Sequence, residues 1–129
     1  MRALLDTHAL LWWLADDAQL SAPARAVLAD GGNQVLVSAA TALEIAVKVR
    51  LGRLPPGASE LASDFEPQIL REGFDLLSFT AEHGIRSGRL PGPHRDPFDR
   101  MLVAQAQALG VPIISADRAF DAYGLPRIW

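Results

Sequence analysis

The sequence predicts an α/β fold in which a central parallel sheet of about four or five strands is flanked by helices on both faces. Two observations lead to this fold class. Short runs of aliphatic residues alternate along the chain with longer segments whose apolar residues recur at helical spacing. Half of the 129 residues are hydrophobic, which is enough for a sizeable core. We therefore expect one domain over residues 1–129, with parallel strands joined through helical crossovers.

The predicted strands are short apolar runs that end close to polar residues. The first run ends at Asp6, the second is bounded by Ser38, and Asp117 lies just past the fourth. Aliphatic and β-branched residues in such runs are typical of buried strands in a parallel sheet. The predicted strands are residues 2–6, 35–37, 74–77 and 111–115, with residues 126–129 as a candidate fifth.

The predicted helices have recognisable start and stop signals. Ser21 precedes Ala22 and Pro23, which is typical of a capping residue and a first turn. Pro67 is expected to kink or split the segment 58–72. Residues 55–57 are predicted as a helix stop, and residues 90–93 as an irregular loop. The predicted helices are residues 7–15, 22–30, 41–49, 58–72, 81–88 and 97–109.

The segment 94–106 turns from a loop into a helix that begins with acidic residues. Asp96 is suited to cap this helix, Pro97 fits its first position, and Asp99 falls in its first turn. One face of the helix is largely apolar at helical spacing, formed by Phe98, Met101, Leu102, Gln105 and Leu109. A helix that begins in this way fixes a carboxylate at its own start.

Composition excludes several classes of protein. No apolar run is long enough to cross a membrane, and the first residues lead directly into Asp6, unlike a signal peptide. The absence of cysteine excludes a disulfide framework and a thiolate zinc site. We therefore expect a cytoplasmic protein without a membrane segment.

The distribution of charge allows two interpretations. The formal net charge is only −3, which neither indicates nor excludes a nucleic-acid partner. The basic residues concentrate in the middle of the chain, at Lys48, Arg50, Arg53, Arg71, Arg86, Arg89, Arg95 and Arg100. They are either solvated helix faces or a groove that faces phosphate groups.

Four acidic residues are predicted to meet at one edge of the sheet. Asp6 and Asp117 follow the first and fourth strands, Glu44 lies near the start of the helix after the second strand, and Asp99 begins the helix 97–109. Ligands of such sheets bind beyond the carboxyl ends of the strands. Carboxylates held close together raise each other's pKa unless a cation neutralises them. Without cysteine or a ligand-spaced pair of histidines, an all-oxygen site favours Mg²⁺ or Mn²⁺.

Each of these acids also has a local explanation. Thr41 and Glu44 have the spacing of a capping box, and Asp99 suits the positive end of its own helix. Asp6 and Asp117 are each placed to cap the helical segment that follows. We favour the shared site because four separate local roles would still have to bring all four acids to the same edge.

Four neighbouring residues are candidate supporting groups. Thr7 and Ser115 adjoin the site acids and are placed to orient them or to bind water on the metal, with ordinary capping as the alternative. Asp96 is expected to cap, with an outer role at the site as the second interpretation. Arg100 is expected either to steer phosphate or to pair with Asp96 or Asp99.

With the acids in this order, the chain resembles the PIN-domain ribonucleases, and in particular the VapC-type toxins of bacterial toxin–antitoxin pairs. The matching stretches are residues 4–12, 37–46, 94–100 and 114–117. The resemblance implies a PIN-like α/β/α fold and an endoribonuclease that depends on Mg²⁺ or Mn²⁺. The family's acids correspond to Asp6, Glu44, Asp99 and Asp117, where Asp99 is preferred to Asp96 because the apolar helix follows it.

The resemblance also implies partners and leaves alternatives. It implies an RNA substrate, a homodimer or a higher toxin–antitoxin assembly, and a small, separate VapB-like antitoxin that blocks the metal site. Two other classes of protein are disfavoured. A haloacid-dehalogenase-like phosphatase needs a second Asp where His8 stands, and a receiver domain needs an acidic pair beside the first strand, whereas Asp16 and Asp17 lie beyond a helix. A non-toxin RNA-processing nuclease and a non-catalytic PIN-fold binding module remain as alternatives.

Overall fold

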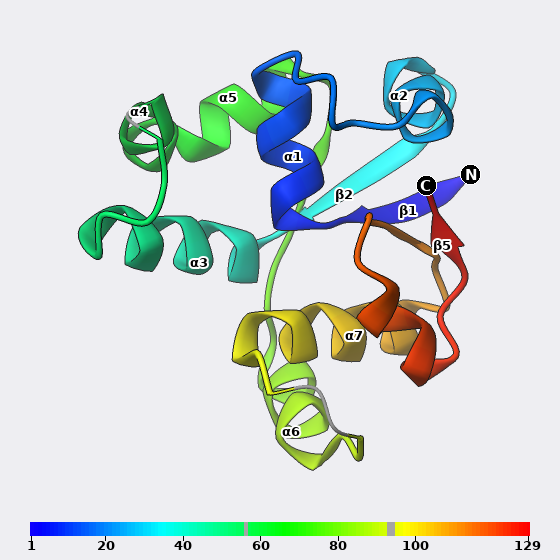
Figure 1. Ribbon diagram of the computed structural model, residues 1–129. Coiled ribbons are helices and arrows are strands. Elements are labelled where there is room, and N and C mark those ends of the chain that lie inside the picture. Colours follow the sequence, from blue (N-terminus) through cyan, green and yellow to red (C-terminus); the bar gives the residue numbers. More distant parts are fainter. Residues whose placement is uncertain (56, 93–94) are drawn as a thin grey trace.

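Five parallel strands form one sheet in the computed structural model of the chain, which describes residues 1–55, 57–92 and 95–129. The strand order is β3-β2-β1-β4-β5, so the first strand lies in the centre of the sheet (Figure 1). The strands are β1 (Arg2–Leu5), β2 (Gln34–Ser38), β3 (Asp75–Leu77), β4 (Ile113–Ile114) and β5 (Arg127–Ile128). The predicted parallel sheet is confirmed, including its fifth strand, although β4 is shorter than the predicted segment.

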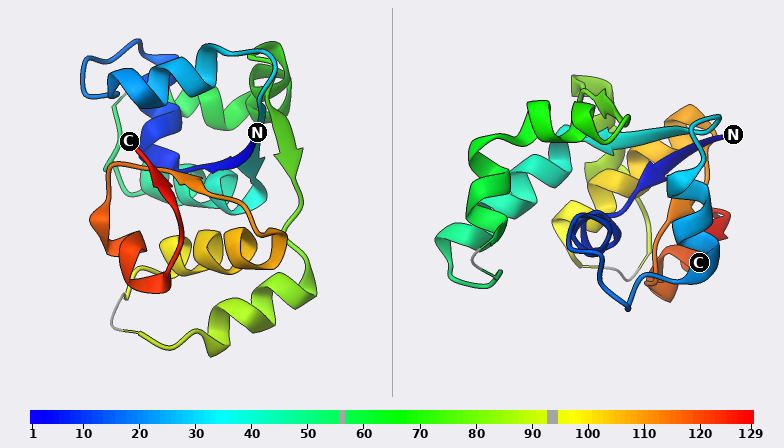
Figure 2. Two further views of the ribbon diagram at one scale, coloured as in Figure 1. Left: turned by 90° about the vertical axis from the view of Figure 1, so that its right-hand side faces the viewer. Right: turned by 90° about the horizontal axis from the view of Figure 1, so that it is seen from above.

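Helices cover both faces of the sheet, as predicted (Figure 2). The elements are α1 (Thr7–Leu14), α2 (Ala22–Ala29), α3 (Ala39–Arg50), α4 (Gly57–Ser63), α5 (Phe65–Arg71), α6 (Ala81–Arg89), α7 (Pro97–Leu109) and the 3₁₀ helix η1 (Arg118–Tyr123). Helices α1, α2 and α5 lie on one side, whereas α7, with α6 outside it, lies on the other. In the described part of the chain, no helix is both long and apolar enough to span a membrane.

Alternating side chains of the strands supply two apolar clusters, one on each face. Leu5 of β1 packs in the cluster under α1 and α2, whereas its neighbour Leu4 packs under α7. Ile114 and Ile113 of β4 divide in the same way. Because successive side chains of a strand point to opposite faces, both faces of the sheet must be covered to bury them.

The helix that carries Glu44 begins earlier than the sequence predicted. The segment was predicted to start at residue 41, but α3 starts at Ala39, and Ser38 is its N-cap. The Ser38 hydroxyl accepts a hydrogen bond from the backbone N–H of Ala40 at 2.9 Å. Thr41 is therefore inside the helix, and the capping box suggested by Thr41 and Glu44 does not form.

The segment predicted as residues 58–72 is split into two helices. The break falls at Asp64, between α4 and α5, and Pro67 occupies the third position of α5. Proline is tolerated in a first turn because its missing N–H has no partner there in any case. The predicted effect of Pro67 is thus confirmed, with the break three residues before it.

Helix α7, which follows Asp96, forms as predicted. Asp96 caps α7 by accepting from the N–H groups of Phe98 and Asp99, at 2.9 and 3.2 Å, and Pro97 is the first helical residue. Gly110 ends the helix in the left-handed region, with φ 65°. Three residues of the predicted loop and turn segments lie outside the described residues, namely Pro56, Pro93 and His94.

The cap of α7 predicts a change in stability. Asp96→Ala should lower the free energy of unfolding by about 1 kcal/mol, because two N–H groups at the helix start lose their acceptor. Asp96→Asn, which keeps an acceptor oxygen, should lose much less. Urea denaturation of the three proteins checks this. Equal losses in both variants would show that charge, rather than the hydrogen bonds, is what Asp96 supplies.

Candidate active site

The carboxyl ends of β1 and β4 lie side by side, at the point where the chain changes direction across the sheet. Such a switch point is where parallel α/β sheets bind ligands. Asp6 follows β1 directly and Asp117 follows β4 after two residues. Glu44 reaches the same edge from α3, and Asp99 from the first turn of α7.

Asp6 is a buried acid whose pKa is strongly perturbed. Its exposed fraction is 5%, and burial raises the pKa of its carboxyl to about 7. A hydrogen bond from Ser115 opposes this rise, whereas the negative charges of Asp99 and Glu44 add to it. Three of the predicted acids are therefore within electrostatic reach at one place, and Asp6 exchanges a proton near neutral pH.

Glu44 is buried with only half of its carboxylate satisfied. It is 2% exposed, and its Oε2 accepts a hydrogen bond from Lys48, one turn later on α3. Its Oε1 is buried and has no hydrogen-bond partner among the described residues. A buried carboxylate oxygen without a partner is costly, so Glu44 Oε1 is suited to accept from a water molecule or to bind a cation.

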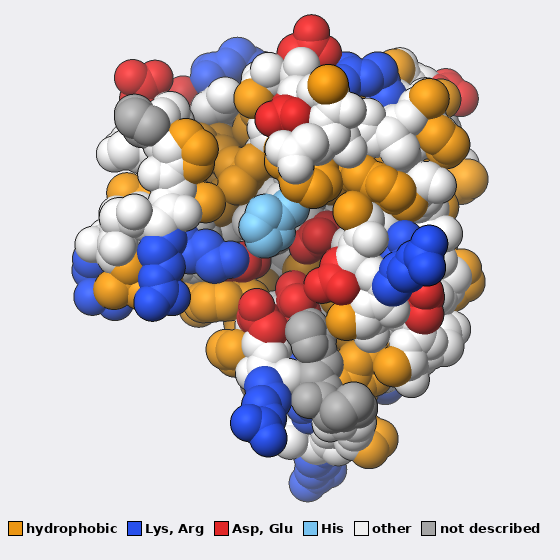
Figure 3. Space-filling model, in the orientation of Figure 1, with side chains coloured by type: hydrophobic (Ala, Val, Ile, Leu, Met, Phe, Trp, Pro, Cys, Tyr) orange, Lys and Arg blue, Asp and Glu red, His pale blue; other side chains and the backbone are white. Residues whose placement is uncertain are grey.

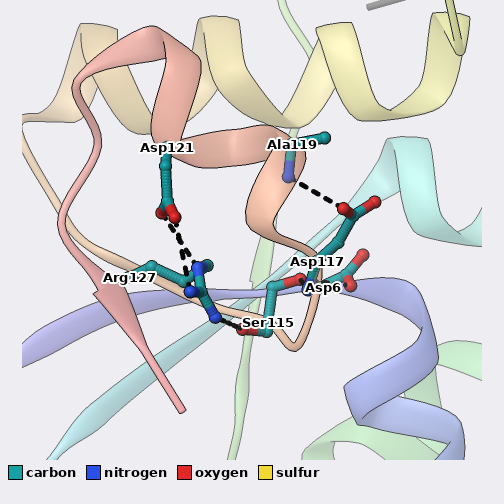
Figure 4. A network of polar contacts seen from close by, with 6 residues as sticks. All are labelled: Asp6, Ser115, Asp117, Ala119, Asp121 and Arg127. Carbon is teal, nitrogen blue, oxygen red and sulfur yellow. Dashed lines mark hydrogen bonds and ion pairs between the residues drawn. The ribbon is translucent and has the colours of Figure 1, made fainter.

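Ser115 connects Asp6 to the loop that carries Asp117 (Figure 4). Its hydroxyl donates to Asp6 Oδ2 at 2.8 Å and accepts from the backbone N–H of Asp117 at 3.0 Å. Because the amide can only donate, the hydroxyl hydrogen must be directed at Asp6. Asp117 itself is exposed, and its Oδ1 caps η1 by accepting from the N–H of Ala119 at 2.9 Å.

Arg127 of β5 contacts the same loop at two places (Figure 4). Its Nη1 donates to the Ser115 carbonyl at 3.1 Å, and its Nε donates to Asp121 Oδ1 at 2.9 Å. The hydrogen bond from Arg127 lowers the pKa of the Asp121 carboxyl and outweighs the opposing effect of desolvation. The loop from Ser115 to Asp121 is thus fixed at two points by one side chain.

The remaining candidates have local contacts. Asp99 is half-buried at the third position of α7. Thr7 Oγ1 lies 3.1 Å from Thr41 Oγ1, which joins the starts of α1 and α3. Arg100 donates to the Leu90 carbonyl and lies 3.5 Å from the Tyr123 hydroxyl, so these contacts direct it to the loop before α7.

Acidic side chains border a hollow on one face of the molecule, in the region of α1, α3 and α7 (Figure 3). Within residues 1–55, 57–92 and 95–129, no three acidic or histidine side chains are placed as a ready-made metal cluster. The donor set nevertheless fits a hard divalent cation, because every candidate ligand is a carboxylate oxygen and Glu44 Oε1 is buried without a partner. From the sequence, Lys48 was predicted only as one of the basic residues and Thr41 only as a cap, and Arg127 was given no role at the site. The four-residue spacing of Glu44 and Lys48 on a helix was a usable signal for their pairing.

Comparison with known proteins defines the class. The PIN domain family matches residues 3–125, so the chain belongs to the PIN domain family. Over 60 residues it is 45% identical to Ribonuclease VapC16 from Mycobacterium tuberculosis; this segment is 46% of the chain and 41% of that relative's length. The resemblance inferred from the sequence is thereby confirmed.

Solved structures share the fold along nearly the whole chain. A chain of VapBC2 from Rickettsia felis, bound to a promoter DNA fragment, superposes with a TM-score of 0.70, 14% identity and coverage of 98% and 97% of the two chains. VapC20 from Mycobacterium tuberculosis, described as a Sarcin-Ricin loop cleaving toxin, gives 0.70, 18% identity and 95% coverage of both. FitAcB from Neisseria gonorrhoeae gives 0.68, 22% identity and coverage of 98% and 96%. At these identities the likeness establishes the fold alone.

The raised pKa of Asp6 predicts an unusual dependence of stability on pH. Between pH 3.8 and about 7 the folded protein retains a proton that the unfolded chain releases. The contribution of Asp6 to the free energy of unfolding is therefore complete below pH 3.8 and is lost as the pH rises through 7, by up to about 4 kcal/mol. Asp6→Asn should thus gain stability relative to wild type as the pH rises from 3.8 to about 7, with little further gain above that pH.

Urea denaturation in the presence of chelator measures this difference. The exposed Asp30 supplies the control, since Asp30→Asn should follow the wild-type pH profile. Parallel profiles for wild type and Asp6→Asn would contradict the assignment of a raised pKa to Asp6.

Proposed function

We propose that this protein is a metal-dependent endoribonuclease that acts as the VapC-like toxin of a toxin–antitoxin pair and inhibits translation. The observation that carries the proposal is the unpaired, buried Glu44 Oε1 close to the buried Asp6, at the ligand-binding edge of a PIN domain. Buried carboxylates that lie close together suit a metal-assisted reaction on a phosphate.

The proposed cofactor is Mg²⁺ or Mn²⁺, held by carboxylates. Asp6, Glu44 and Asp99 would hold it, with Asp117 at the exposed rim of the site. When bound, such an ion lowers the pKa of water and stabilises negative charge on a phosphate. Oxygen ligands favour these hard cations over zinc or copper.

The side chains have distinct roles in the proposed hydrolysis. The Ser115 hydroxyl holds Asp6 by Oδ2, so Oδ1 is the oxygen left to act at the site. One carboxylate accepts the proton of the attacking water, which displaces the 3′ oxygen in line and leaves 5′-phosphate and 3′-hydroxyl ends. Because water is the nucleophile, the 2′-hydroxyl is not required for cleavage. RNA would be selected by loop shape and access to single strands.

The relatives support the substrate and partner proposals. One relative is named a ribonuclease, one solved neighbour is described as a loop-cleaving toxin, and another is a toxin–antitoxin complex from Klebsiella pneumoniae with a TM-score of 0.55. We therefore propose an RNA substrate in the cytoplasm and a small VapB-like antitoxin as partner. A homodimer, or a larger assembly with the antitoxin, is part of the same proposal.

Cleavage of a total cellular RNA pool tests the function. Wild type, freed of antitoxin, should cut with Mg²⁺ or Mn²⁺ and not with chelator. Asp6→Asn and Glu44→Gln should each reduce cutting by more than about 100-fold, because even hydrogen-bond partners of a metal ligand are typically worth about 10- to 100-fold. The Asp30→Asn control should cut like wild type.

Three results of this experiment would contradict the proposed function. Equal behaviour of wild type and Asp6→Asn, or no cutting with either metal, would overturn the nuclease and favour a non-catalytic binding module. Cutting without growth inhibition on expression in a bacterial host would instead favour a housekeeping RNA-processing nuclease.

Binding of the metal has a separate prediction. At a free Mn²⁺ concentration of about 100 times Kd, the folded state should gain about 2.7 kcal/mol, which raises the melting temperature. Glu44→Gln should show little of this rise, because the buried oxygen loses its charge. Differential scanning calorimetry with and without Mn²⁺ measures it, and an undiminished rise in Glu44→Gln would exclude Glu44 as a ligand.

A further inference from the structure

The ion pair of Lys48 with Glu44 differs from the other ion pairs described in this protein. In the pairs of Arg25 with Asp16, Arg71 with Asp64, and Arg127 with Asp121, the acidic side chain is 89%, 53% and 52% exposed. The Glu44 side chain is 3% exposed, and that of Lys48 is 23% exposed. Exposed pairs contribute little to stability, whereas a cation beside a buried site acid acts on the electrostatics of that site.

Lys48 lies between the buried carboxylate of Glu44 and the solvent, because its side chain is partly exposed. It occupies the last turn of α3, and basic side chains border the acidic side chains where this helix ends (Figure 3). Arg50 and Arg53, which follow it, are exposed. A chain of phosphates that approaches the acids from this side therefore meets positive charge first, with Lys48 the nearest to Glu44.

The ammonium group of Lys48 has unused donors. Within the described part of the chain, its one hydrogen bond goes to Glu44 Oε2. A lysine ammonium has three N–H bonds, so two remain for other acceptors. The other oxygen of Glu44 is the buried, unpaired Oε1. One carboxylate oxygen thus faces the lysine while the second remains for an ion, and the two uses do not compete for the same atom.

We propose that Lys48 binds the RNA phosphate at the active site, donating to a non-bridging oxygen while it stays paired with Glu44. The proposal rests on the nuclease function proposed above. Lysine is a compact point charge that suits this task, because it contacts phosphate without a fixed fork geometry. Without substrate, the same charge partly neutralises the acids; with substrate, it offsets the repulsion between these acids and the phosphate.

A matched set of variants tests this role by RNA binding. Lys48→Met removes the donor, Lys48→Arg keeps the charge, and Arg71→Met removes one charge at the end of α5. That helix leads into the start of β3, at the sheet edge opposite the acids, so Arg71→Met controls for net charge. Each change is made in Asp6→Asn protein, so that the RNA is not cut, and binding of a fluorescent single-stranded RNA of mixed sequence is followed by anisotropy with Mg²⁺.

Lys48→Met should weaken RNA binding by about 10-fold and reduce the slope of log Kd against log salt concentration by about 0.7, the value for one lost phosphate contact to a single strand. Lys48→Arg should restore most of the affinity, and Arg71→Met should change it by less than about 2-fold. Calorimetric titration with Mn²⁺ alone uses the Lys48→Met single variant, in which Asp6 is intact. It should show binding equal to wild type or tighter, because a positive charge beside the ligands has been removed.

Two results would overturn the proposal. Equal RNA affinities of Lys48→Met and Arg71→Met would show that Lys48 makes no phosphate contact. Joint loss of RNA and Mn²⁺ binding in Lys48→Met would show that it only holds Glu44 in place. Either result is compatible with RNA cutting by wild type, so failure here is distinct from failure of the nuclease function, which the Asp6→Asn cleavage assay reports.

Discussion

The hydrogen bond from Ser115 to Asp6 is the contact on which the site depends. It joins the ends of two strands that are distant in sequence and adjacent in the sheet, next to the backbone bond from the Asp6 N–H to the Ile114 carbonyl at 3.0 Å. The Ser115 hydroxyl orients the buried Asp6 and also accepts from the Asp117 N–H, which fixes the loop. Arg127 contacts the same loop through the Ser115 carbonyl. The geometry of the edge follows from these few bonds.

The carboxyl groups of Asp6 and Glu44 are buried at a cost in folding stability. Burial opposes ionisation of Asp6, and Glu44 has a buried oxygen without a hydrogen-bond partner among the described residues. Among the described residues, the Ser115 hydroxyl donates to Asp6 and the Lys48 ammonium pairs with Glu44. This arrangement is what supports the bound cation of the proposed function.

A second buried polar network lies behind the site and sets where α3 begins. Gln105 of α7 is fully buried, and its Oε1 accepts from the Ser38 hydroxyl. Its Nε2 donates to the Ser78 carbonyl at 3.1 Å and lies 3.1 Å from His83 Nδ1. His83 Nδ1 also accepts from the Thr80 N–H, so its ring hydrogen lies on Nε2. The sequence analysis placed Gln105 on an apolar face by its spacing, and only the fold shows that its amide links α7 to the cap of α3.

The sequence by itself determined the order of strands and helices along the chain and the capping of α7 by Asp96. It also determined the split near Pro67 and the positions of Asp6 and Asp117 beyond the ends of strands. These features follow from local rules, because turn residues, proline and hydrophobic spacing act within a few residues. Tertiary structure decided what each acid contacts: Thr41 bonds Thr7 rather than capping its helix, Glu44 pairs with Lys48, and Ser115 serves Asp6. The four-residue spacing of Glu44 and Lys48 makes their pairing derivable from the sequence, but its burial is not. The other two contacts could not be derived locally, because they join segments that are distant in the sequence.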